Sequence, residues 1–135
     1  MAKVRFYLFE TRNERQVEST CRLCRKILRQ AQRIWIYSPN AELQQQIDQQ
    51  LWTFDPSSFI AHGIDDLHAP VCISAQLPTQ GQWILINLSV NSINDTNYLE
   101  QIIEIVENNE SAKHIGREKF KSYRDLGLEL NTYKL

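Results

Sequence analysis

The last predicted helix, over 111–126, carries the residues best suited to binding a ligand. Its cations and one aromatic ring recur at i, i+4, i+7, i+8 and i+11, which places them on one side of the helix. These residues are Lys113, Arg117, Phe120, Lys121 and Arg124. Arginine can clamp a carboxylate through two parallel hydrogen bonds, and lysine adds a point charge. The pattern therefore suits an anionic peptide with an apolar anchor, although a solvated basic face or a nucleic-acid-binding face would look the same.

A group of large aromatic side chains forms the second candidate site. Trp52, Phe54 and Phe59 lie within eight residues, where a predicted helix gives way to a loop. If they are exposed, such rings form a hot spot for a protein partner. If they are buried, they pin the loop onto the sheet. The residues alone leave both interpretations open.

The other motifs of the sequence give little support for catalysis or nucleotide binding. The chain has four glycines, and neither G-x-G-x-x-G nor G-x-x-x-x-G-K-[ST] occurs in it. Backbone amides therefore cannot gather around a pyrophosphate in the usual way. A nucleophile-elbow sequence is also missing. We expect no cofactor and no catalytic residues.

The histidines suggest only a weak metal site. The candidate ligands in the loop over 53–69 are His62, Asp65, Asp66 and His68. Such spacing arises easily by chance, and it also fits a polar surface loop. We therefore expect no bound metal here.

Cys21 and Cys24 form a C-x-x-C pair, which could indicate redox or zinc chemistry. Both fall in the middle of a predicted helix, on the same side as Val17 and Leu28. A zinc site would need a second pair of ligands, and a redox site would place the first Cys at a helix N-terminus. Since free cysteine is among the most buried residue types, we expect the pair to pack in the core.

The elements that position these side chains alternate between strand and helix. Strands are expected over 3–9, 33–37, 71–74 and 83–89, and helices over 13–32, 40–52 and 111–126. Asn94–Asn97 would cap a further helix, with Leu99, Ile102, Ile103 and Val106 as its core stripe. The segment over 53–69 is expected to be an irregular loop. This order indicates a three-layer α/β domain with a mainly parallel central sheet, and the 135 residues suit one domain over 1–135.

The composition favours a cytoplasmic protein. The chain contains no apolar run near the ~20 residues that span a bilayer, and its start reads as a strand instead of a signal peptide. An odd number of cysteines, three, argues against a secreted disulfide framework.

The charges are segregated along the chain, although the net charge is only −1. Nine of the Lys and Arg residues lie in 3–33 and six in 113–134, whereas 34–112 has ten acids and no Lys or Arg. Surfaces of opposite sign can steer partners. The acidic middle predicts little direct DNA binding over most of the surface.

The sequence resembles the chi subunits of bacterial DNA polymerase III almost from end to end. The shared residues begin with Phe6-Tyr7-Leu8, continue through Leu51-Trp52, and are densest in R-E-K-F-K-S-Y-R-D-L-G-L-E-L-N-T, from Arg117 to Thr132. The resemblance implies a Rossmann-like fold without a phosphate-binding loop and without catalytic activity. It also implies a clamp-loader accessory protein that connects the psi subunit to the acidic C-terminal tail of single-stranded DNA-binding protein. That tail ends in a proline-phenylalanine carboxylate.

The same resemblance assigns roles to individual positions. The tail pocket would comprise Val106, Lys113, Arg117, Phe120 and Lys121, with Tyr123, Arg124 and Leu130 near it. Trp52 and Phe59 would lie on the surface that meets psi, which a helicase-like protein could also use. The chain departs from the family at Phe120, where members often carry Tyr, and over 61–82, where its loop is shorter.

Two other functions compete with this adaptor. One is a nucleic-acid-binding domain that uses the basic faces of the first and last helices. The other is a degenerate nucleotide-binding or hydrolase fold with an unrecognised site.

Overall fold

The structure is a computed structural model that describes residues 2–11, 13–28, 30, 32–53 and 61–135. In chain order its elements are β1 (Lys3–Leu8), α1 (Gln16–Leu28), β2 (Ile34–Tyr37), α2 (Ala41–Thr53), β3 (His62–Ile64), β4 (Val71–Ser74), β5 (Trp83–Asn87), β6 (Leu99–Val106), α3 (Glu110–Asp125) and β7 (Glu129–Lys134). Among these described residues no helix is both long and apolar enough to cross a membrane.

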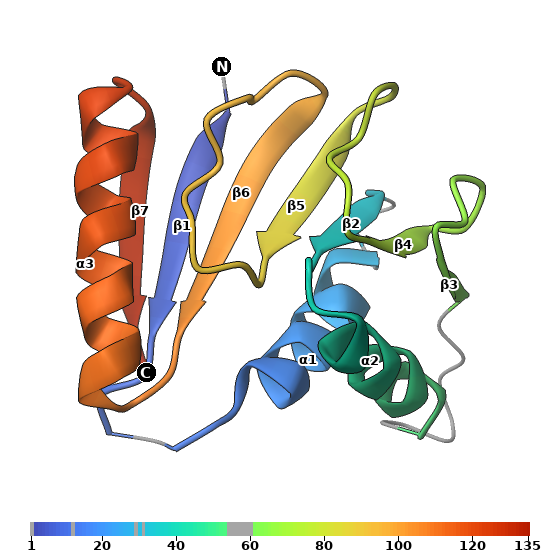
Figure 1. Cartoon of the computed structure of the whole chain (residues 1–135), viewed down its shortest axis with the longest axis horizontal. Coiled ribbons are helices and arrows are strands. Elements are labelled where there is room, and N and C mark those ends of the chain that lie inside the picture. Colours follow the sequence, from blue (N-terminus) through green and yellow to red (C-terminus); the bar gives the residue numbers. More distant parts are fainter. Residues whose placement is uncertain (1, 12, 29, 31, 54–60) are drawn as a thin grey trace.

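The strands form one seven-stranded sheet in the order β3-β4-β2-β5-β6-β1-β7, and every neighbouring pair is parallel. Figure 1 shows α3 alongside β7 and β1, whereas α1 and α2 lie at the other end of the sheet, near β2 and β4. Parallel strands need crossover connections, and these place helices on both faces of the sheet. The predicted three-layer α/β fold is therefore confirmed.

Alternate residues of each strand divide the core into two clusters, one on each face of the sheet. On β5, Ile84 and Ile86 pack with residues of α1 and α2, whereas Trp83 and Leu85 pack with Tyr123 of α3. This alternation follows from the period of two in a strand. The central strands are buried on both faces, as parallel strands covered by helices require.

The prediction of a helix after Asn94–Asn97 is wrong, because Leu99–Val106 forms strand β6. This strand pairs with β5 on one side and with β1 on the other, so both its edges are satisfied. Ile103 and Ile105 face the α1 side, while Ile102 and Val106 face the α3 side. A strand with both faces buried carries apolar residues at nearly every position, and these also match a helical spacing over a short segment.

Smaller differences concern element boundaries. The loop expected over 53–69 contains the short strand β3, and β7 was not expected. Helix α1 spans Gln16–Leu28, shorter than the predicted 13–32. By contrast, α3 ends at Asp125, close to the predicted end at 126, and Gly127 follows with a φ of 77°. Only glycine adopts this left-handed conformation without strain, so Gly127 ends the helix as expected.

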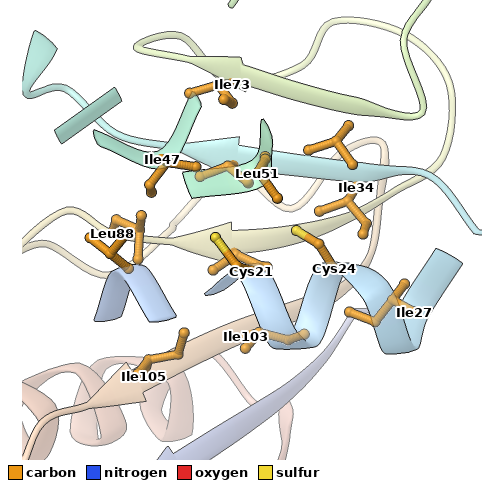
Figure 2. Packing of buried hydrophobic residues seen from close by; sticks show 14 of the residues in the cluster. Cys21, Cys24, Ile27, Ile34, Ile47, Leu51, Ile73, Leu88, Ile103 and Ile105 are labelled. Carbon is orange, nitrogen blue, oxygen red and sulfur yellow. The ribbon is translucent and has the colours of Figure 1, made fainter. Parts of the chain in front are cut away.

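Cys21 and Cys24 lie fully buried in the core, as the sequence predicted. Figure 2 shows both side chains pointing from α1 toward the strands, near Ile34 and Ile103. Burial raises the pKa of Cys21 to about 12 and that of Cys72 to about 11, and it raises the pKa of Cys24 further. All three thiols are free and remain protonated at neutral pH.

We predict that the native protein resists thiol-specific labelling with Ellman's reagent at pH 8. With a pKa of about 12, Cys21 is ionised in only about one molecule in ten thousand at this pH, and burial also blocks access. The same protein unfolded in urea should react completely within minutes. Rapid labelling of the native protein would contradict the buried placement of the thiols.

Candidate functional site

A pocket of about 410 Å³ lies between α3 and the sheet, at the carboxyl ends of β1 and β6. Its lining residues are Phe6, Leu8, Glu10, Val106, Glu110, Lys113, Gly116, Arg117, Phe120 and Thr132. They come from β1, β6, β7, α3 and the segments that follow the strands. We refer to this site as the α3 pocket.

The topology of the sheet explains the position of the α3 pocket. Strands β1 and β6 are neighbours, yet β1 leads into α1 and β6 leads into α3, on opposite faces. The two connections therefore diverge at the carboxyl ends of the strands. In open α/β sheets this point of divergence is where a crevice forms and where ligands usually bind.

The floor of the α3 pocket is apolar and depends on a glycine. Phe6 and Phe120 contact each other with ring centroids 5.5 Å apart, which joins β1 to α3. Gly116 is buried against Val106, and a Cβ at this position would lie 2.9 Å from Val106 Cγ2. Such a distance is too short for real Cβ atoms. Glycine therefore allows α3 to approach the sheet closely at the pocket floor.

Charges of opposite sign occupy different parts of the rim. Lys113 and Arg117 stand one helical turn apart, and the Arg117 side chain is exposed. Among the described residues, neither cation has an acidic side chain within 4 Å. Glu10 and Glu110 form an acidic part of the rim, near the N-terminus of α3. The arrangement suits a ligand with an apolar group for the floor and an anionic group for the cations.

The structure gathers some of the predicted pocket residues and separates others. Val106, Lys113, Arg117 and Phe120 line the α3 pocket. The residues outside this lining are Lys121, Tyr123, Arg124 and Leu130. Lys121 and Arg124 are exposed on α3, and Lys121 pairs with Glu118 at 3.8 Å. Leu130 packs partly buried against the α3-side cluster.

The pocket residues that the sequence did not identify are Phe6, Leu8, Glu10, Glu110, Gly116 and Thr132. Phe6 and Leu8 alternate on β1, so the period of two could have placed them on the same face. Thr132 lies on β7, which was not expected as a strand.

Tyr123 contacts Phe6 of the α3 pocket edge-on and belongs to a buried polar cluster centred on Glu104 of β6. Lys119 Nζ donates to Glu104 Oε1 at 2.8 Å and to the Ser89 carbonyl at 2.6 Å. The Tyr123 hydroxyl and the Asn87 amide donate to Glu104 Oε2. The backbone N–H of Ile93 donates to the Tyr123 hydroxyl at 3.1 Å.

This cluster provides hydrogen-bond partners for the Glu104 carboxylate, which is almost completely removed from water. Burial raises the pKa of Glu104, and the charge and hydrogen bonds of Lys119 oppose that shift. The pKa of Tyr123 is also raised, by burial and by the Glu104 charge. Because Lys119 and Tyr123 belong to α3, the cluster fixes this helix over β6 and so positions Gly116 and Phe120 at the pocket.

The second predicted site is described only in part. Trp52 lies near the end of α2 and is 57% exposed, which agrees with the expectation of an exposed ring. Its ring contacts that of His62 edge-on, with centroids 4.9 Å apart. His62 Nε2 in turn lies 3.2 Å from Asp48 Oδ1 on α2. Phe54 and Phe59 lie outside the described residues.

The loop residues considered as metal ligands take part in local hydrogen bonds. Asp65 accepts from the Ser74 hydroxyl at 2.7 Å, and Asp66 accepts from the backbone N–H of His68 at 3.0 Å. Within the part of the chain that the structure describes, no group of three or more His, Cys, Asp or Glu residues is arranged to hold a metal ion.

Comparison with known proteins identifies the family. The family model described as DNA polymerase III chi subunit, HolC, matches residues 1–131. The chain belongs to this family. Its members are replication accessory subunits of DNA polymerase III, as the resemblance had implied.

Three curated relatives named DNA polymerase III subunit chi match over nearly their full length. The chi subunit of Pseudomonas aeruginosa is 26% identical to this chain, and the matched region covers 100% of this chain and 98% of the relative. The chi subunit of Haemophilus influenzae is 29% identical, and the matched region covers 98% of this chain and 97% of the relative. That of Escherichia coli is 25% identical, also over 98% and 97%.

We predict that Lys119→Met destabilises the fold strongly, because it leaves the buried Glu104 carboxylate without its cation. Removing one partner of a buried pair typically costs about 3 kcal/mol or more of unfolding free energy. Adding Glu104→Gln should recover part of this loss, since a glutamine keeps hydrogen-bond partners without a charge. Urea unfolding monitored by circular dichroism measures both effects.

Lys121→Met is the matched control, because Lys121 is exposed on the same helix and its ion pair with Glu118 spans 3.8 Å. Its cost should stay within about 0.5 kcal/mol. Equal stability of the Lys119→Met and Lys121→Met proteins would show that the buried pair does not anchor α3.

Proposed function

We propose that this chi-family chain is a non-catalytic adaptor that binds the acidic C-terminal tail of a single-stranded DNA-binding protein and links it to the clamp loader through a psi subunit. The observation that carries the proposal is the α3 pocket. Four of the residues that the family resemblance assigns to tail binding, Val106, Lys113, Arg117 and Phe120, line one cavity with an apolar floor and a cationic rim.

The two ends of such a tail match the two parts of the α3 pocket. The terminal phenylalanine ring would enter the apolar floor between Val106 and Phe120. The adjacent terminal carboxylate would meet Arg117, with Lys113 one turn away. Glu10 and Glu110 would repel the acidic residues upstream of the terminus, and would direct them along α3 toward Lys121 and Arg124.

Phe120 supports this binding mode without the hydroxyl that family members often carry. Its ring already packs against Phe6, so it contributes an aromatic wall to the pocket. A hydrogen bond that a tyrosine could make to the ligand is absent from the proposed complex. The apolar contact with the terminal ring therefore contributes a larger part of the binding free energy here than it would beside a tyrosine.

The surface around Trp52 is the proposed contact with psi, and a helicase-like protein would compete for it. Exposed tryptophan is enriched among residues that dominate protein interfaces. The proposal also includes a cytoplasmic location and no catalysis or cofactor. It is supported by the family membership and by a sequence without phosphate-binding loop motifs.

We predict that Arg117→Ala weakens binding of an acidic peptide ending in Pro-Phe by ten-fold or more, as measured by isothermal titration calorimetry. A charge-assisted hydrogen bond contributes about 1.5–3 kcal/mol, and an exposed site lies at the low end of this range. Arg117→Lys should recover only part of the affinity, because an ammonium group cannot form the two parallel hydrogen bonds. Affinity should also fall as salt rises.

Lys26→Ala serves as the control, because it removes one positive charge from α1, which does not contribute to the α3 pocket. This variant should bind the peptide like the wild type. A peptide lacking the final phenylalanine should bind as poorly as the full peptide binds to Arg117→Ala. Equal affinities of the wild type and Arg117→Ala for the full peptide would refute this placement of the tail.

We predict that Trp52→Ala weakens capture of psi by about thirty-fold, the equivalent of about 2 kcal/mol for an interface hot spot. The thermal midpoint of unfolding should change little, because the ring is 57% exposed. Tyr98→Ala truncates another exposed ring, 43% exposed, and should leave psi binding unchanged. Undiminished capture by Trp52→Ala in a pull-down with purified psi would argue for a different interface.

A further inference from the structure

One part of the sheet, formed by β1 and β7, presents a face that does not pack under α3. The side chains on this face alternate with those that contact α3, and in register they form the cross-strand pairs Lys3–Glu129, Arg5–Asn131 and Tyr7–Tyr133. Helix α1 contacts β2 and β6 on this side, and β7 is the edge strand. The residues of β7 that belong to this face are all exposed.

Two tyrosines at the end of this face form an aromatic platform. The rings of Tyr7 and Tyr133 are stacked, with centroids 5.3 Å apart and planes inclined by 23°. Tyr7 is partly buried against the core, whereas Tyr133 is 42% exposed. A cavity of about 180 Å³ beside Tyr7 is lined in part by Arg22 and Lys26 of α1.

Cations outnumber acids around the platform. Lys3 pairs with Glu129 at 3.6 Å, and Arg22 pairs with Glu14. Within the described part of the chain, Arg5 and Lys26 have no acidic side chain within 4 Å. All these basic residues come from 3–33, one of the two cation-rich ends of the sequence, and not from its acidic middle.

We infer that this tyrosine face, comprising Arg5, Tyr7, Arg22, Lys26 and Tyr133, binds single-stranded nucleic acid. Proteins that bind single strands combine aromatic rings on which bases stack with cations that follow the phosphates. An open sheet surface with a stacked tyrosine pair and flanking cations provides both. A base would stack on the exposed Tyr133 ring, and the neighbouring phosphates would lie toward Lys26 and Arg5.

This site differs in chemistry and position from the α3 pocket. The α3 pocket is lined by even-numbered residues of β1 and β7, such as Phe6, Leu8 and Thr132, and the tyrosine face by odd-numbered ones. The two sites therefore lie on opposite faces of the same strands and can be occupied together. The inference does not rest on the proposed function of the α3 pocket.

Fluorescence anisotropy with a labelled twelve-residue oligothymidylate at low salt tests the inference. Tyr133→Ala should weaken binding by about five-fold or more, as the loss of one base-stacking ring does elsewhere, whereas Tyr133→Phe should retain it. Lys26→Ala should weaken binding and lower the slope of log affinity against log salt by about 0.7, the value for one lost phosphate contact. Tyr98→Ala, on a different segment, should bind like the wild type.

An excess of the acidic Pro-Phe peptide distinguishes the two sites, because it should leave the oligonucleotide bound. Displacement of the oligonucleotide by the peptide would overturn the inference, since both ligands would then share the α3 pocket. The absence of saturable binding at low salt would also overturn it. So would equal affinities of the wild type, Tyr133→Ala and Lys26→Ala.

Discussion

A carboxylate buried beneath a helix is the interaction on which the α3 side of this molecule depends. Glu104 lies on β6 with only 1% of its surface exposed, and a charge in such a place requires partners. Two of these partners, Lys119 and Tyr123, come from α3, and Asn87 comes from the neighbouring strand β5. The observed placement of α3 brings both Lys119 and Tyr123 to the carboxylate, which Asn87 reaches from the sheet. The polar cluster therefore specifies the position of the helix more narrowly than apolar packing alone would.

The α3 pocket follows from that placement. With Lys119 and Tyr123 held against β6, Gly116 meets Val106 and Phe120 meets Phe6. Lys113 and Arg117 precede the buried Lys119 on α3, and both line the pocket. One segment, α3, thus supplies both the residues that anchor the helix and residues that line the pocket. On the opposite face of β1 and β7, Tyr133 remains 42% exposed.

The sequence predicted the elements whose pattern is local. Helix α3 was placed within one residue at each end, because its cations and apolar residues follow a helical period and Gly127 ends it. The same kind of reasoning failed for β6, whose isoleucines match both a helical stripe and a strand buried on two faces. A short apolar segment does not distinguish these cases without knowledge of its neighbours. Four of the eight residues predicted for the tail pocket or its surroundings line it, and Tyr123 instead belongs to the buried cluster. The partnership of Glu104 with Lys119 spans fifteen residues and two elements, so only the fold could reveal it.

The most direct test of the account is to map the acidic Pro-Phe peptide onto the isotope-labelled protein by nuclear magnetic resonance. The account predicts that the largest amide shift changes occur at Val106, at 113–120 on α3 and at Phe6 and Leu8. The amides around Trp52 and Tyr133 should change little. If the largest changes instead appeared on α2 or on the tyrosine face, while Gly116 and Arg117 were unaffected, the α3 pocket would not be the tail-binding site.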